Sequence, residues 1–157
     1  MKTSRIVIAI VMGFVACAEA PERTSAAANA GIDSLNARLV QAYRARDPQI
    51  YGTVFTDTAV FEWPAFNTVR GRAALETMAR ANWGALNQMD LALTVDSRRI
   101  AADNATEFGA FQQSWSDSSG VRMVEYGRYV AYLTRTPDNT WLIDRFFGFA
   151  DSTRPQR

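Results

Sequence analysis

Four β-rich segments follow one another in the second half of the chain, separated only by short turn sequences. Residues 90–102, 105–116, 121–135 and 140–150 are rich in residue types that favour strands. The connections are made of turn-forming residues: Asp103-Asn104, Asp117-Ser118-Ser119-Gly120 and Pro137-Asp138-Asn139. Strands joined by so few residues must pair antiparallel, because a parallel connection needs a longer crossover. The second half therefore predicts one antiparallel meander.

Helical patterns fill most of the first half. Apolar residues recur at helical spacing over about 30–46, and Asp47-Pro48 then supplies an N-cap and a first-turn proline for a short second helix. A strand over Thr58–Trp63 and a third helix over about 72–83 follow. Helices first and a sheet afterwards predict a single α+β domain, which suits a chain of 157 residues.

The N-terminal residues have the layout of a signal peptide. A basic start is followed by the apolar run Ile6–Val15, which is too short for a membrane-spanning helix of about 20 residues. The run ends in Phe14-Val15-Ala16-Cys17, which resembles a bacterial lipobox with Cys17 as the lipidated residue. We expect a signal peptide over 1–17 and a flexible tether over 18–30.

This leader predicts an exported protein that is periplasmic or anchored to the outer membrane by lipid. Contact with the membrane would then run only through the lipid anchor. The alternative is ordinary secretory cleavage after Ala18 or Ala20, which would give a soluble secreted protein.

The composition restricts the chemistry of the domain. The chain has no histidine, and its only lysine (Lys2) and only cysteine (Cys17) lie in the leader. A Ser-His-Asp triad and a histidine metal site are therefore excluded. The formal net charge is +1 with no basic cluster, which argues against nucleic acid as a partner. There is no glycine-rich phosphate loop and no carboxylate cluster at metal-binding spacing, so we predict neither cofactor nor metal.

Four local runs, taken with the order of elements, resemble one known fold. The runs are Tyr43–Pro48, Phe55–Phe61, Val69–Leu75, and Gly127–Tyr129 followed by Pro137–Ile143. Over about residues 32–150 the chain resembles the nuclear transport factor 2-like superfamily, in its SnoaL-like (polyketide cyclase-like) branch. The resemblance implies a cone-shaped, curved antiparallel sheet wrapped around about three N-terminal helices. It places the domain at 31–151 and leaves 152–157 as a disordered tail.

That superfamily includes isomerases, dehydratases, cyclases, hydrolases and binding domains, so the fold alone does not settle the function. The ketosteroid isomerase relatives place an acidic base directly before a proline at the end of the first strand. The matching residue here is Trp63, before Pro64, and Leu39 stands where those enzymes have a catalytic tyrosine. Strand alternation should point the neighbouring Glu62 to the opposite face. Isomerase chemistry of that kind is therefore not expected.

Strand alternation also nominates the residues that face the pocket. We expect Glu125 and Tyr129 to face it, on one side of the strand 121–135, with Arg145 and Phe147 on one side of the last strand. Glu125, Tyr129 and Arg145 would then form a hydrogen-bonded cluster suited to acid–base work or ligand anchoring. The alternatives are a structural Glu125–Arg145 ion pair, or a β-bulge that reverses the alternation. The expected pocket walls are aromatic: Phe61, Trp63, Trp115 and Phe147.

These residues lead to three functional hypotheses. The first is an exported domain that binds a small, largely apolar molecule without catalysis. The second is a His-free hydrolase, dehydratase or cyclase that uses Glu125, Tyr129 and Arg145. The third is a homodimeric structural or interaction module, which pairs through the outer sheet face that carries Tyr126, Val130 and Tyr132.

Overall fold

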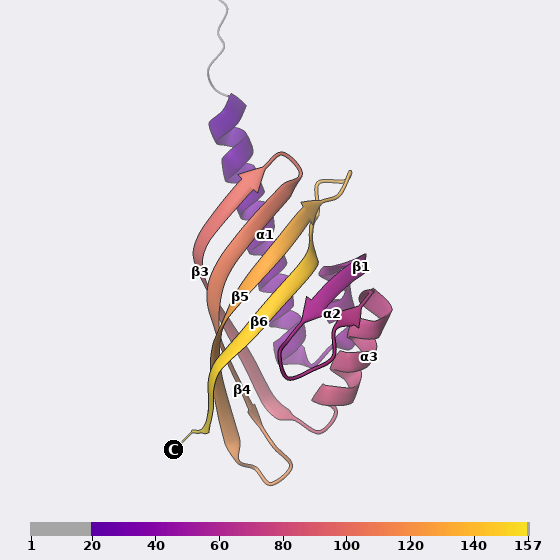
Figure 1. Cartoon of the computed structure of the whole chain (residues 1–157), viewed down its shortest axis with the longest axis vertical. Coiled ribbons are helices and arrows are strands. Elements are labelled where there is room, and N and C mark those ends of the chain that lie inside the picture. The colour runs from indigo at the N-terminus through magenta and orange to yellow at the C-terminus, as the bar shows by residue number, and fades with distance from the viewer. Residues whose placement is uncertain (1–19, 157) are drawn as a thin grey trace, which may run out of the picture.

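The computed structural model describes residues 20–156, with side chains from Ser25 onward (Figure 1). The expected signal peptide and Cys17 lie outside these residues. The elements in chain order are α1 (Ala20–Ala45), α2 (Pro48–Thr53), β1 (Phe55–Glu62), β2 (Val69–Arg70), α3 (Arg72–Trp83), β3 (Asn87–Ala101), β4 (Asn104–Ser116), β5 (Arg122–Arg135) and β6 (Trp141–Pro155).

The strands form one curved, six-stranded sheet in the order β2-β1-β6-β5-β4-β3. Strands β3 to β6 are the predicted antiparallel meander. Strand β1 differs, since it lies beside β6 and runs parallel to it. The sheet is therefore mixed rather than wholly antiparallel, because the long connection through α3 and the meander returns the chain beside β1 in the same direction. The predicted α+β class and curved sheet are confirmed.

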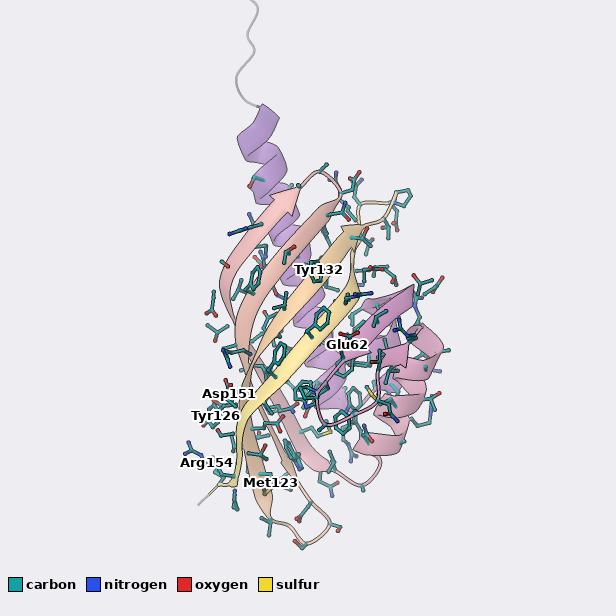
Figure 2. The ribbon with its side chains drawn as sticks, viewed as in Figure 1. Glu62, Met123, Tyr126, Tyr132, Asp151 and Arg154 are labelled. Atoms are coloured by element: carbon teal, nitrogen blue, oxygen red, sulfur yellow. The ribbon has the colours of Figure 1, made fainter. Side chains whose placement is uncertain are left out.

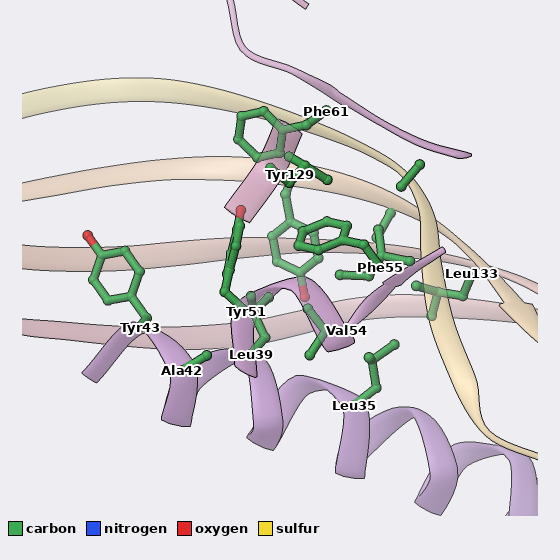
Figure 3. Packing of buried hydrophobic residues seen from close by; sticks show 14 of the residues in the cluster. Leu35, Leu39, Ala42, Tyr43, Tyr51, Val54, Phe55, Phe61, Tyr129 and Leu133 are labelled. Atoms are coloured by element: carbon green, nitrogen blue, oxygen red, sulfur yellow. The ribbon is translucent and has the colours of Figure 1, made fainter. Parts of the chain in front are cut away.

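Helix α1 crosses the concave side of this sheet (Figure 1). Helices α2 and α3 lie beside the C-terminal end of α1. The side of α1 that faces the sheet is apolar at helical spacing. Its buried residues are Ala28, Ile32, Leu35, Leu39, Ala42 and Tyr43. They meet Phe55, Tyr129 and Leu133 in the core (Figure 3). The core thus lies between α1 and the concave sheet face.

Helix α1 begins at Ala20, whereas the expected start was about residue 30. Residues 20–30 are therefore helical rather than a flexible tether. Alanine has the highest helix propensity of all residue types, and this segment contains the run Ala26-Ala27-Ala28. Ala28 is also buried against the core. Asn29 accepts two hydrogen bonds from Arg98 of β3, so this part of the helix is held to the sheet.

Residues 152–155 of the expected disordered tail are also part of the sheet. Strand β6 continues to Pro155 and pairs with β5 through Glu125–Thr153 and Met123–Pro155. The ladder ends with Gln156, whose amide donates to the carbonyl of Arg122 at 2.8 Å. Residues 152–155 are ordered because the long strand β5 offers them unpaired backbone groups.

Three aspartates interrupt the ladders as single extra residues. Asp96 is inserted in β3, and Asp144 and Asp151 are inserted in β6. Aspartate is disfavoured in regular strands, and a bulge lets it leave the ladder. Each bulge exchanges the two faces of its strand for the residues that follow. This exchange decides which of the predicted residues reach the site.

Candidate functional site

A cavity of about 240 Å³ lies between the helices and the concave face of the sheet. Most of the residues that line it are apolar or aromatic, and none is charged. They are Leu39, Tyr43, Tyr51, Phe55, Phe61, Trp63, Phe66, Met78, Ala79, Asn82, Trp83, Leu86, Leu91, Leu93, Phe111, Gln113, Trp115 and Phe146. A small, largely apolar concavity with a few polar groups is the usual form of a ligand site.

Stacked rings form one wall of the cavity. Phe61 lies parallel to Trp63, with ring centroids 6.1 Å apart, and parallel to Phe146 at 5.5 Å. Trp63 also meets Phe111 of β4 at 5.4 Å. The lining thus includes Phe61, Trp63 and Trp115, as predicted from the sequence.

Phe147 is a wrong prediction, and its neighbour Phe146 lines the cavity instead. The cause is the bulge at Asp144. Strand β5 pairs Leu133 with Ile143 and Tyr132 with Arg145, so one residue of β6 is skipped. Ile143 faces the core, and beyond the bulge the inward position falls to Phe146 rather than to Arg145 and Phe147.

Two tyrosine hydroxyls enter the cavity from the helices. The rings of Tyr43 and Tyr51 pack edge-on against Trp83, with centroids 5.5 Å and 5.0 Å away. Within residues 25–156 neither hydroxyl has a hydrogen-bond partner, and no fully buried side-chain polar atom lacks one. Neither hydroxyl is therefore fully buried, and both side chains, labelled in Figure 3, line the cavity. Burial raises the pKa of both phenols well above its usual value, so they are neutral donors.

Gln113 is the polar residue that β4 contributes to the lining. Its amide nitrogen Nε2 donates to Oε1 of Glu125 at 2.5 Å. Oε2 of Glu125 accepts from the hydroxyl of Thr153 at 2.7 Å. Glu125 was predicted to face the pocket, and the structure places it one residue behind the lining, in contact with Gln113.

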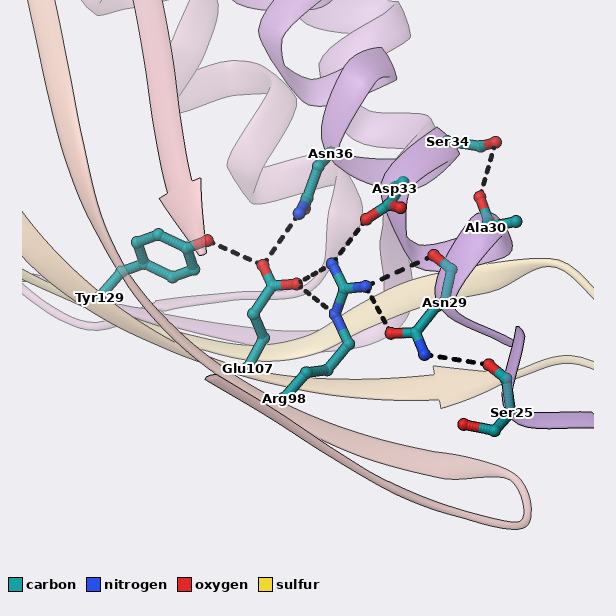
Figure 4. A network of polar contacts seen from close by, with 9 residues as sticks. All are labelled: Ser25, Asn29, Ala30, Asp33, Ser34, Asn36, Arg98, Glu107 and Tyr129. Carbon is teal, nitrogen blue, oxygen red and sulfur yellow. Dashed lines mark hydrogen bonds and ion pairs between the residues drawn. The ribbon is translucent and has the colours of Figure 1, made fainter. Parts of the chain in front are cut away.

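Tyr129 points into the core, toward a buried polar network rather than toward Glu125 (Figure 4). Its hydroxyl donates to Oε1 of Glu107 at 2.8 Å. Glu107 is 1% exposed and also accepts from Asn36 at 2.9 Å and from Nε of Arg98 at 2.8 Å. Arg98 in turn pairs with Asp33 at 2.8 Å. This network connects α1 to β3, β4 and β5.

Arg145 lies on the other side of the sheet, where its guanidinium stands 5.8 Å from the ring centroid of Phe147. Glu125, Tyr129 and Arg145 therefore do not come together, and both the predicted cluster and the alternative Glu125–Arg145 ion pair are wrong. Glu62, labelled in Figure 2, is half-buried on β1 and is not part of the lining.

A family profile described as the SnoaL-like domain matches residues 24–146. The chain belongs to the SnoaL-like family. The match covers both walls of the cavity and ends within β6. None of the curated proteins matches the chain in sequence.

Solved structures with the same fold support this SnoaL-like assignment. A ketosteroid isomerase-like protein from Erwinia carotovora atroseptica has a TM-score of 0.69 at 18% identity, covering 78% of this chain and 95% of its own. A hexachlorocyclohexane dehydrochlorinase of LinA type 3 from Novosphingobium barchaimii has a TM-score of 0.73 at 14% identity, covering 86% and 94%. A conserved protein from Planctomyces limnophilus has a TM-score of 0.73 at 18% identity, covering 83% and 99%. At these identities the likeness concerns the fold alone.

The SnoaL-like domain shows two further properties in its described part. Residues 20–156 contain no group of three or more carboxylate or thiol side chains placed to hold a metal ion. Over the same residues, no helix combines the length and the apolar character needed to cross a bilayer.

Sequence reasoning missed the buried carboxylate beside the site and two hydroxyl groups of its lining. Glu107 and the hydroxyls of Tyr43 and Tyr51 were not nominated as a group. The alternation Ala105, Glu107, Gly109, Phe111 carried a signal, since it puts Glu107 on the inner face of β4. Only the strand register shows that Arg98 lies directly opposite it.

Proposed function

We propose that this SnoaL-like domain binds a small, largely apolar molecule in the cavity between α1, α3 and the sheet, without catalysing its conversion. The observation that carries the proposal is the lining itself, which is rich in aromatic rings and holds no charged side chain. Its volume of about 240 Å³ lies below the roughly 300–1,000 Å³ of drug-sized sites, which suits a molecule of one or two rings.

The catalytic alternative loses its geometric basis. A His-free hydrolase, dehydratase or cyclase was expected to use Glu125, Tyr129 and Arg145 around an open cavity. Instead the hydroxyl of Tyr129 donates a hydrogen bond to Glu107, and Arg145 lies on the outer face of the sheet. Acid–base catalysis requires the groups to be within hydrogen-bond reach of one substrate.

Calorimetric titration with a panel of one- and two-ring apolar compounds tests the binding proposal. Leu93→Trp would fill the cavity from β3, because Leu93 lines it, and should abolish binding. Val95→Trp, two residues along the same strand, is the matched control, since Val95 is 40% exposed and is not part of the lining. Equal affinity of the two variants, or no binding by the unmodified protein, would contradict the proposal.

We further propose that two copies pair through the outer face of the sheet. This face carries exposed aromatic side chains, namely Phe108, Tyr126, Tyr132 and Phe149. Tyr126 and Tyr132 lie along β5 on the side turned away from α1 (Figure 2). The same face holds both signs of charge, as in the Arg128–Asp151 ion pair at 2.8 Å. Mixed charge around apolar groups suits a self-complementary two-fold contact.

A further inference from the structure

Three polar side chains line up across neighbouring strands at one end of the cavity. We call Gln113 of β4, Glu125 of β5 and Thr153 of β6 the polar ladder. Gln113 and Glu125 are paired in the strand register, as are Glu125 and Thr153, so all three share one face of the sheet. Phe111 and Trp115, two residues either side of Gln113, line the cavity. The polar ladder therefore belongs to the concave, ligand-facing side.

The polar ladder fixes the orientation of the Gln113 amide. An ionised carboxylate only accepts hydrogen bonds, so Glu125 must face the NH2 group of Gln113. Thr153 holds the second oxygen of Glu125 and limits its rotation. The carbonyl oxygen of Gln113 accepts no hydrogen bond from residues 25–156, and it is not fully buried, because no fully buried side-chain polar atom there lacks a partner. A ligand in the cavity thus meets a pre-oriented acceptor.

The charge of Glu125 is not balanced by a basic partner in the described part of the chain. Arg122, three residues away, donates to Gln156 at 2.8 Å and to Ser114 at 2.7 Å. Arg44, on the helix nearest this end, pairs with Asp90 at 2.5 Å. The pKa of Tyr43 is raised first by burial and next by the negative charge of Glu125. The charge of Glu125 therefore acts on a residue that lines the cavity. An anionic ligand would therefore lie near a half-buried carboxylate, one residue behind the lining, that has no compensating cation.

We propose that the cavity selects neutral or cationic molecules that carry a hydrogen-bond donor on an apolar ring body, and that it discriminates against carboxylates. The donor group bonds to the carbonyl of Gln113, while the rings lie between Trp63, Trp115 and Phe146. The inference rests on the proposed binding function and gives that function its ligand class.

Four probes with the same two-ring body test it: naphthol, naphthylmethylamine, naphthalene and naphthoate, titrated calorimetrically into the full chain near neutral pH. Naphthol and naphthylmethylamine should bind at least about tenfold more tightly than naphthoate. They gain a hydrogen bond to the carbonyl of Gln113, whereas naphthoate is repelled by Glu125, and together these effects are of about this size. If no probe binds, the proposed function fails and the inference with it. If naphthoate binds as tightly as naphthol, the binding function stands and the inference is wrong.

Two variants separate charge from hydrogen bonding. Glu125→Gln keeps the size of the side chain and should raise the affinity for naphthoate and lower that for naphthylmethylamine. Gln113→Leu removes the acceptor and should bring naphthol down to the affinity of naphthalene. Asp96→Asn is the control, since its exposed carboxylate lies in a groove with Phe108, Arg128 and Phe149. A shift of the same size in Asp96→Asn, or no shift in either ladder variant, would overturn the inference.

Discussion

Glu107 is the one carboxylate that is buried within residues 25–156. Removing a charge from water costs several kcal/mol unless partners compensate it. Here Asn36, Arg98 and Tyr129 supply hydrogen bonds to both oxygens. Burial, followed by the negative charge of Glu107, raises the pKa of Tyr129 far above its ordinary value, so the phenol remains a donor. A carboxylate with all of its partners in place is suited to hold α1 on the sheet.

Replacing this carboxylate should destabilise the fold rather than abolish a reaction. Glu107→Ala leaves Arg98, whose side chain is 10% exposed, without its buried partner. We expect a loss of about 3–5 kcal/mol in the free energy of unfolding, as for other broken buried ion pairs. Urea unfolding followed by circular dichroism measures it.

The matched control is Asp103→Ala, which removes an ion pair with Arg135 in which Asp103 is 67% exposed. Such pairs contribute about 0–1 kcal/mol. Similar losses in the two variants would show that Glu107 does not hold α1 on the sheet.

At this scale the sequence predicted inward-facing residues well where strands are regular. Glu125, Tyr129, Phe61, Trp63 and Trp115 all lie on the inner side. Arg145 and Phe147 were placed on the wrong face because strand alternation assumes a regular strand, and the bulge at Asp144 breaks that regularity. The partner of Glu107 was missed because a register between strands is a long-range property.

Among the elements, the β4–β5 hairpin is closed by the side chain of Asp117. Its Oδ1 accepts from the hydroxyl of Ser119 at 2.6 Å and from the amides of Ser119 and Val121 at 2.9 Å and 3.0 Å. These hydrogen bonds, that from the Ser119 hydroxyl foremost, hold the pKa of Asp117 below its usual value. The ionised form is therefore favoured in the folded state.

This pKa predicts a pH dependence with a definite sign. Because the folded-state pKa is lowered, the contribution of Asp117 is complete above the unfolded value of about 3.9 and is lost as pH falls through the folded value. The stability difference between the unmodified protein and Asp117→Asn should be constant above about pH 5 and shrink below about pH 4.

Thermal unfolding across that pH range measures the difference. Ser119→Ala is the companion variant, since it removes the principal hydrogen bond and should make the difference smaller and less dependent on pH. A difference that grows as the pH falls would contradict the assignment.

Element types were predictable because the local signals agree with the fold. Helix α3 has the predicted bounds, and the meander follows the turn residues. Residues 20–30 and 152–155 were predicted to lie in a flexible tether and a disordered tail. Both are ordered by distant partners, Arg98 for the start of α1 and strand β5 for the end of β6.

For the whole molecule, the proposed dimer gives the plainest measurement. A chain that begins at residue 20 should have the mass of two copies by light scattering. Tyr132 is a 46% exposed aromatic residue of the outer face, so Tyr132→Arg places a charge there and should give monomers. Val121→Arg, in the exposed β4–β5 turn, is the control and should remain dimeric. A monomer without any substitution would refute the proposal.

The overall architecture was predictable from the order of elements, which is specific to few folds. The parallel pairing of β1 with β6 was not, because no local signal records which strand a distant segment will join. The cavity depends on that pairing, since it brings Phe61 beside Phe146.

Helix α1 also places the cavity far from the start of the domain. It has 26 residues, and those that line the cavity, Leu39 and Tyr43, come near its end. At about 1.5 Å per residue, the helix start lies roughly 30 Å along the axis from the cavity. With a lipid on Cys17, as we propose, the cavity would lie near the end of α1 that is farther from the anchor.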